Sequence, residues 1–225
     1  MNVKATYCWG LLLLASVVFG QADSTRIGFD LKFGKQPLRL HQKYISGKDT
    51  LEIGAFRFYI GHFECQLEDG STIKDSRDYH LLDAEKPESL QIALPLSSQK
   101  IKEVSFCIGV DSTASVSGAL SGALDPANGM YWAWQSGYIN LKIEGQSKSC
   151  PTRKNEFQFH IGGYLPPHYA IRQVKLPMVG QNPVIAVDLA HFFSPIALSK
   201  TNQVMVPGKN AMALADLSTE MFRTE

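Results

Sequence analysis

The feature that most constrains this fold is an alternation of apolar and polar residues with a period of two. In residues 26–33 (RIGFDLKF), every second side chain is apolar, from Ile27 to Phe33. This period is that of a half-buried β-strand, because successive side chains of a strand point to opposite faces. Further stretches with strand character are residues 56–67, 90–96, 104–110, 131–144, 157–161, 171–178 and 184–189. Clusters of Gly, Pro, Asn, Asp and Ser separate several of them, as turns do.

Long helical patterns do not alternate with these stretches, which argues against a parallel βαβ sheet. The sequence therefore predicts an all-β fold, an antiparallel β-sandwich or a partly closed barrel. A short helix is expected near the C-terminus, capped by Asn210 and with Leu214, Leu217, Met221 and Phe222 on its apolar face. Because no repeat or linker divides the chain, residues 21–225 are expected to form a single domain.

Two of the predicted strands contain a change of phase. In residues 56–67 the apolar positions switch from even to odd at Gly61, which predicts a β-bulge there, beside His62. In residues 131–144, Gly137 is placed to reset the phase in the same way. With a bulge at Gly137, Trp132 and Trp134 are buried in the core. Without one they face the opposite side, as an exposed aromatic platform.

The first twenty residues have the pattern of a secretory signal peptide. Lys4 gives a positive start, an apolar run extends from Cys8 to Phe19, and small residues follow. The run is too short to span a bilayer, which needs about 20 apolar residues, and no later stretch reaches that length. We therefore predict a signal peptide over residues 1–20, a periplasmic or secreted protein, and no membrane span.

Without the signal peptide the charges balance, because Lys4 is lost from 22 basic against 21 acidic residues. A neutral chain gives no electrostatic reason to expect nucleic acid as a partner. Three cysteines remain, Cys65, Cys107 and Cys150. In an oxidising compartment they allow at most one disulfide, and we expect one bridge and one buried cysteine.

Recognisable catalytic motifs are missing from the sequence. It contains no nucleophile elbow, phosphate-binding loop, dinucleotide fingerprint or zinc-protease motif. The chain is therefore expected not to be an enzyme. None of its six histidines has a local metal-ligand spacing, but a β-scaffold gathers residues that are distant in sequence. Imidazole suits copper and zinc, and thioether or thiolate sulfur selects Cu(I).

A resemblance to a known family comes from residues 122–145 (GALDPANGMYWAWQSGYINLKIEG), which resemble the signature of the MbnP-like family. These are exported β-proteins similar to the copper-binding protein associated with methanobactin operons. The resemblance continues in residues 56–60 (FRFYI), 106–111 (FCIGVD), 159–163 (FHIGG), 187–189 (VDL) and 204–208 (VMVPG). It covers essentially the whole chain after the signal peptide, and the Met-Tyr-Trp-x-Trp-Gln-x-Gly-Tyr core is its most specific part.

The resemblance implies a mononuclear Cu(I) site built from two histidines and an oxidised tryptophan, kynurenine. His160 matches one of the histidines, and Trp132 or Trp134 matches the tryptophan. In the metal-binding branch of the family the second histidine precedes the tryptophans, but here residues 111–118 (DSTASVSG) contain none. The candidate replacements are His80, and the softer donors Met205 and Met130. The resemblance also implies a redox partner that oxidises the tryptophan.

Two functions from different classes follow. The first is a non-catalytic, exported copper-binding protein that sequesters or delivers Cu(I), with His160 as its principal ligand. The alternative is a binding module without metal, which stacks glycan or protein on Tyr131, Trp132, Trp134 and Tyr138. The alternative requires these rings to be exposed together.

Overall fold

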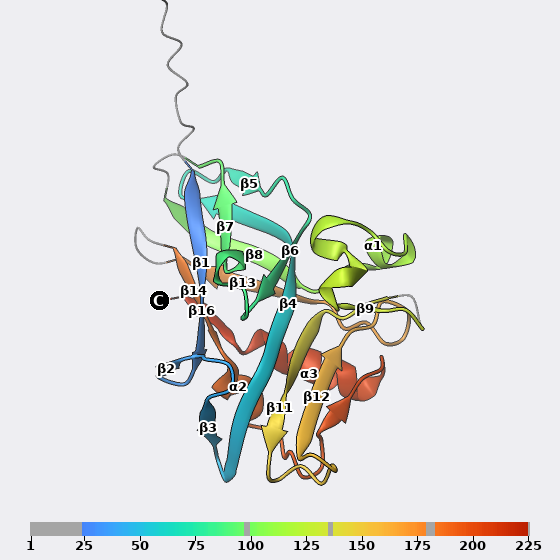
Figure 1. The fold of residues 1–225 in the computed structure, drawn as a ribbon. Coiled ribbons are helices and arrows are strands. Elements are labelled where there is room, and N and C mark those ends of the chain that lie inside the picture. Colours follow the sequence, from blue (N-terminus) through green and yellow to red (C-terminus); the bar gives the residue numbers. More distant parts are fainter. Residues whose placement is uncertain (1–23, 97–99, 135–136, 179–182, 225) are drawn as a thin grey trace, which may run out of the picture.

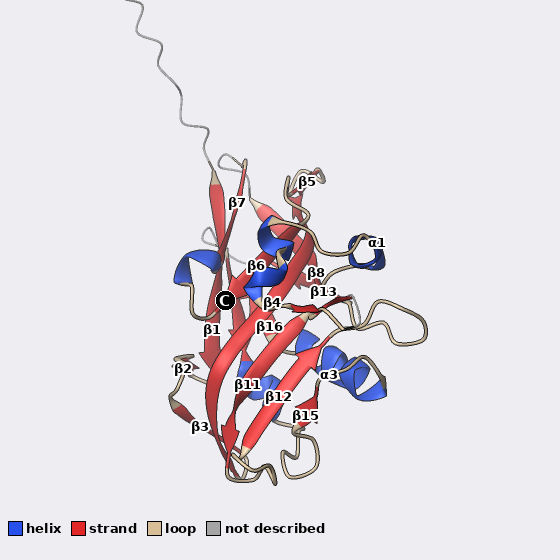
Figure 2. Ribbon diagram, turned by 45° about the vertical axis from the view of Figure 1, so that its right-hand side comes forward, coloured by secondary structure: helices blue, strands red, loops and turns tan. Residues whose placement is uncertain are grey.

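The computed structural model describes residues 24–96, 100–134, 137–178 and 183–224. The predicted signal peptide, residues 1–20, lies outside the described residues. Strands far outnumber helices in the described chain and form packed sheets, which confirms the predicted fold class (Figures 1 and 2). None of the helices in these ranges is long and apolar enough to cross a membrane.

The strands form two large sheets. The first contains β1 (Thr25–Phe33), β2 (Gln36–Pro37), β7 (Gln91–Leu94), β14 (Val184–Asp188) and β16 (Phe222–Thr224). The second has the order β13-β8-β4-β11-β12-β15, with β3, β5 and β6 also paired to β4. Its strands are β3 (Lys43–Ser46), β4 (Asp49–Leu67), β5 (Thr72–Lys74), β6 (Tyr79–Asp83), β8 (Ile101–Ile108), β11 (Leu141–Ser147), β12 (Glu156–Ile161), β13 (Arg172–Pro177) and β15 (Gln203–Val204). Pairing is mostly antiparallel, but β1 with β14 and β12 with β15 are parallel.

The two sheets pack against each other through aromatic rings, as in a sandwich. Phe29 of β1 meets Phe63 of β4 and Phe106 of β8 edge to face, with ring centroids 6.5 and 6.2 Å apart. Phe222 of β16 contacts both Phe58 and Phe106. These rings belong to one large buried cluster, which we call the main core. The alternation in residues 26–33 therefore places β1 as predicted, with its odd-numbered apolar side chains buried.

Short helices cover the ends of the sandwich. Helix α2 (Leu189–Phe193) packs on β1, and α3 (Lys209–Thr219) packs on both β12 and β13, which lie toward opposite ends of the second sheet. This sheet is therefore curled, and α3 bridges its ends. The expected C-terminal helix is present, but its N-cap is Gly208 and not Asn210. Asn210 lies two residues too late to cap, because the helix already begins at Lys209. The helix ends at Thr219, so Met221 lies beyond it and Phe222 begins β16.

The predicted bulge is present in β4. Its pairing with β8 shifts between Gly61 and Glu64, and His62 has a left-handed backbone conformation (φ 51°). Phe58 and Ile60 before the bulge, and Phe63 and Cys65 after it, are all buried in the main core. The extra residue thus returns the apolar positions to the same face, as the change of phase predicted.

A second, smaller cluster covers the other face of the second sheet. We call its covering segment the cap: residues 111–134 and 137–138, which contain α1 (Ser112–Val116), η2 (Gly122–Leu124), η3 (Pro126–Asn128), β9 (Tyr131–Trp132) and β10 (Gly137–Tyr138). The buried residues of this cluster are Tyr59, Val110, Leu124, Met130, Trp132, Tyr138 and Ile139. Tyr59 lies between Phe58 and Ile60 of the main core, so it points to the opposite face. In Figures 1 and 2 the cap lies on the side of β4 away from β1.

The expectation of one disulfide is wrong. Within the described chain Cys65, Cys107 and Cys150 are all free. Cys65 lies in the main core, whereas Cys107 alternates with the core residues Phe106 and Ile108 and so faces the cap side. Cys150 lies in the turn after β11. Two side chains on opposite faces of a sheet cannot reach disulfide geometry.

We expect Gly145→Ala to destabilise the fold. A Cβ at Gly145 would lie 2.2 Å from the Glu52 carbonyl oxygen and 2.5 Å from Phe157 Cζ, beside the bulge where β11 shifts its pairing with β4. Overpacking of this kind costs about 1–3 kcal/mol in the free energy of unfolding, measured by urea denaturation. Gly28→Ala is the control, since its Cβ would meet Val184 at an ordinary 3.9 Å. Equal effects of the two substitutions would contradict this account.

Candidate functional site

A row of polar side chains crosses four neighbouring strands on the cap side of the second sheet. Asp83 of β6 pairs with Arg57 of β4, Arg57 with Lys142 of β11, and Lys142 with His160 of β12. His160 alternates with Phe159 and Ile161 of the main core, so it points to the cap side, as the sequence predicts. The row therefore ends at a buried imidazole, of which only 8% is exposed.

His160 is held by a carboxylate from the neighbouring strand. Its Nε2 lies 2.6 Å from Oε1 of Glu144, and Lys142 Nζ lies 3.3 Å from the same oxygen. The hydrogen bond from His160 lowers the pKa of Glu144; burial opposes this effect and the charge of Lys142 adds to it. Glu144 is therefore an ionised acceptor, to which the imidazole donates.

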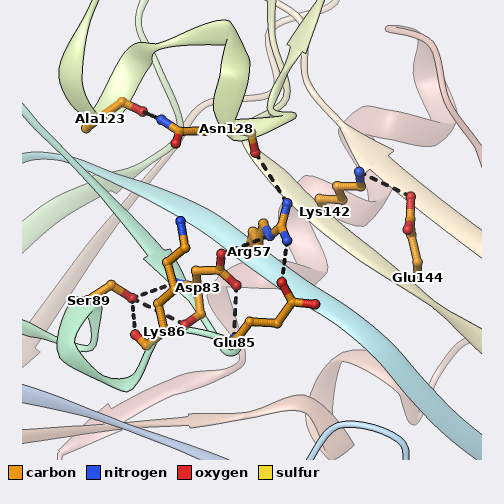
Figure 3. A network of polar contacts seen from close by, with 9 residues as sticks. All are labelled: Arg57, Asp83, Glu85, Lys86, Ser89, Ala123, Asn128, Lys142 and Glu144. Atoms are coloured by element: carbon orange, nitrogen blue, oxygen red, sulfur yellow. Dashed lines mark hydrogen bonds and ion pairs between the residues drawn. The ribbon is translucent and has the colours of Figure 1, made fainter.

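Arg57 connects the row to the cap (Figure 3). Its guanidinium lies 3.0 Å from Asp83 and 2.6 Å from Glu85, and it donates to the carbonyl oxygen of Asn128 at 3.3 Å. Asp83 is buried, so its carboxylate depends on Arg57 for charge compensation. Arg57 thereby fixes the η3 end of the cap against β4.

A polar groove of about 460 Å³ lies beside the row, on the side away from the cap residues Met130 and Trp132. Four glutamates line it, Glu52, Glu85, Glu144 and Glu156, together with Arg57 and Lys142. The site thus has an ionic side toward the groove and an apolar side toward the cap.

The two tryptophans have different surroundings. The prediction that both are buried and the prediction that both are exposed are therefore each right for only one of them. Trp132 is buried, and its ring lies over Gly162: a Cβ there would be 2.8 Å from Cζ3 of the indole. Trp134 is 63% exposed, with its ring centroid 6.0 Å from that of Trp132. Gly162 directly follows β12 and lies two residues after His160, so Trp132 packs on the chain just beyond the end of that strand.

The candidate methionines lie on two sides of His160. Met130 is fully buried in the cap cluster with Trp132. Met205 is 38% exposed and directly follows β15, whose Val204 pairs in parallel with Phe159. Met205 therefore lies one residue beyond the β12–β15 pairing, as His160 lies one residue beyond Phe159. The structure thus puts Trp132 over the residue two after His160, and Met205 directly after the strand that pairs with β12.

His80 lies apart from this neighbourhood. It alternates with Leu81 of the cap cluster and shares its face with Leu82 of the main core, so it points to the opposite side of the sheet from His160. Its Nε2 is hydrogen-bonded to Asp75, and both side chains are buried. In the described part of the chain, no group of three or more His, Cys, Asp or Glu residues is placed to hold a metal ion.

The aromatic platform of the alternative function is not formed by its four rings together. Tyr138 and Trp132 are buried, Tyr131 is half-buried, and only Trp134 is largely exposed. The hydroxyl of Tyr138 is used inside the cap, where it donates to main-chain carbonyl oxygens and accepts from the Leu120 amide.

Sequence reasoning missed Glu144, Lys142 and Arg57, because the row exists only once four strands are paired.

It also missed a second polar cluster, in which Asp111 Oδ2 lies 2.8 Å from His62 Nε2 and accepts from the Tyr79 hydroxyl at 2.5 Å. This cluster lines a cavity of about 1000 Å³ between the cap and the β6–β7 connection. Burial raises the pKa of Asp111, but its hydrogen bonds, first that from Tyr79, outweigh burial and lower it. The only sequence signal was the position of His62 at the predicted bulge.

We expect Arg57→Met to lower the free energy of unfolding by about 3 kcal/mol, because it leaves the buried Asp83 carboxylate without a counter-charge. Urea denaturation measures the loss. Adding Asp83→Leu to Arg57→Met should recover most of it. Lys74→Met is the control, since it breaks an exposed ion pair with Glu64 that is worth at most about 1 kcal/mol. A double variant as unstable as the single one would contradict the assignment.

Stability should fall as the pH drops below the ordinary histidine value. Burial lowers the pKa of His80 in the folded protein, although Asp75 partly opposes this. Below about pH 6.5 the unfolded chain binds a proton at His80 that the folded chain does not bind, so the free energy of unfolding decreases. In His80→Gln this dependence between pH 7 and 5.5 should be weaker, by denaturation at each pH. His191→Gln, at an exposed histidine, should keep the wild-type slope; an unchanged slope in His80→Gln would refute the prediction.

The comparisons with known proteins agree with this fold. The model of the MbnP family matches residues 22–206. Among solved structures, MbnP from Methylosinus trichosporium is similar over 85% of this chain and 83% of that chain, with a TM-score of 0.57 and 16% sequence identity. No curated protein matches the sequence. The structural likeness at this identity shows a shared fold, and the family match extends over most of the sequence. The chain belongs to the MbnP family.

Proposed function

We propose that this protein is an exported, non-catalytic copper-binding protein that carries Cu(I) as cargo for sequestration or delivery. The observation that carries the proposal is the buried His160 of β12, with Trp132 packed over Gly162 and Met205 directly after β15, the strand that pairs with β12. Membership of the MbnP family supports it, because the family resemblance implies copper. The presence of the secretory pattern in residues 1–20 supports export to the periplasm or outside the cell.

The donor chemistry fits Cu(I) better than harder ions. His160 supplies an imidazole and Met205 a thioether, and the combination of imidazole with soft sulfur favours Cu(I). Trp132 offers an indole face for cation–π contact, and its oxidation to kynurenine by a redox partner would add an aryl amine. The second histidine that the family resemblance implies is replaced in this proposal by Met205, because His80 points to the other face of the sheet.

Anaerobic titration of the purified protein with Cu(I), against a colorimetric Cu(I) chelator, tests the proposal. We expect one equivalent to bind, His160→Ala to abolish binding, and Met205→Leu to weaken it about tenfold or more, because leucine keeps the volume but not the sulfur. His191→Ala and Met178→Leu are the matched controls, with wild-type affinity expected. Mass spectrometry of the peptide with both tryptophans reports whether Trp132 or Trp134 is oxidised.

The results separate the parts of the proposal. Wild-type affinity in His160→Ala would remove this residue from the site, and with it the copper function proposed here. Loss in His160→Ala with wild-type affinity in Met205→Leu would leave His160 as a ligand and exclude the thioether. Binding of one equivalent by protein with unmodified tryptophans would show that oxidation is not required.

A further inference from the structure

Glu144 belongs to the second sheet and not to the cap segment. It lies on β11, one pair of residues along from Lys142, so it is the diagonal neighbour of His160 across the β11–β12 pair. Diagonal neighbours are within reach of long side chains, and here the carboxylate reaches the imidazole at 2.6 Å. That distance is typical of a charge-assisted hydrogen bond.

The direction of this contact determines which ring nitrogen of His160 can bind a ligand. A carboxylate oxygen accepts hydrogen bonds, so the 2.6 Å contact with Glu144 Oε1 assigns the proton to Nε2 of the ring. The lone pair is then on Nδ1, for which no hydrogen bond to the described residues is found. Lys142 contacts the same oxygen of Glu144 and so holds the carboxylate in place beneath the ring.

We infer that Glu144 is a positioning residue for His160: it fixes the ring orientation and the Nε2–H tautomer, and so presents Nδ1 as the metal-binding nitrogen. This inference rests on the proposed function, since it assigns a role toward Cu(I). Glu144 itself is not assigned as a ligand, because carboxylate oxygen is a hard donor and Cu(I) is a soft ion. A carboxylate that accepts from the second nitrogen of a metal-binding histidine is a recurrent arrangement, and its loss typically lowers metal affinity 10–100-fold.

Two readouts on the same variants test the inference. The first is the tautomer of His160 in copper-free protein, read from imidazole ¹⁵N chemical shifts at pH 8 and assigned by the signals missing in His160→Ala. We expect the Nε2–H tautomer in the wild type, the same tautomer in Glu144→Gln, whose amide oxygen still accepts, and a mixture in Glu144→Ala. A role limited to strand pairing would leave the tautomer unchanged in all three proteins.

The second readout is Cu(I) affinity by chelator competition. Glu144→Ala should bind 10–100-fold more weakly than the wild type, and Glu144→Gln should lie between them. Glu156→Gln and Glu156→Ala are the matched controls, because Glu156 lines the same groove and forms its ion pair with Lys154 rather than with His160. Both should bind copper as the wild type does. If Glu144→Ala does not fold, Glu144→Gln and the wild-type tautomer still decide the question.

The outcomes distinguish this inference from the proposed function. Loss of binding in His160→Ala with wild-type affinity in both Glu144 variants overturns the positioning role and leaves the copper function in place. An Nδ1–H tautomer in the wild type also overturns it, whatever the affinity. A wild-type protein that binds no Cu(I) overturns the function, and the positioning role with it.

Discussion

The structure depends on the burial of both faces of one long strand. β4 has 19 residues and pairs with strands along both of its edges. Its main-core face is covered by the first sheet, and its other face by the cap and the polar row. Hydrophobic burial on the main-core face supplies most of the driving force for folding. The other face also buries apolar side chains, but there a buried charge has to be compensated as well. Arg57 meets this second requirement, because it neutralises Asp83 and at the same time fastens the cap.

The candidate site lies where the cap borders the polar row. Trp132 of the cap lies over Gly162, just beyond the end of β12, and the face of the sheet at His160 is ionic, with Lys142 and Glu144. The His160 imidazole contacts the Glu144 carboxylate, and the indole packs on the residue two positions further along the chain. The edge position of β15 adds a partly exposed sulfur from Met205. The combination needs no side chain from the main core, so the residues that stabilise the fold and those that would bind copper are largely separate.

The period of two predicted much of the fold because the face to which a side chain points is a local property. It assigned β1, the bulge at Gly61 and the cap-side orientation of His160 correctly. It could not predict which strands are neighbours, since pairing is non-local: the parallel contact of β12 with β15, the strand directly before Met205, leaves no local pattern. The same limit applies to Glu144, whose role depends on a diagonal contact between strands. For the tryptophans, the cap puts one ring inside and the other outside, which a single change of phase does not describe.

The free cysteines have a consequence for the sulfur chemistry of the molecule. Burial raises the pKa of the Cys65 thiol to about 12, with a further contribution from Asp75, and burial also raises the pKa values of Cys107 and Cys150. At pH 7 the Cys65 thiol is therefore protonated, and the thiolate is the form that attacks disulfides, reacts with oxidants and binds metals. The sulfur that the protein offers most readily is thus a thioether, which carries no charge and does not form disulfides. A chain of this kind tolerates an oxidising compartment without cross-linking to its neighbours.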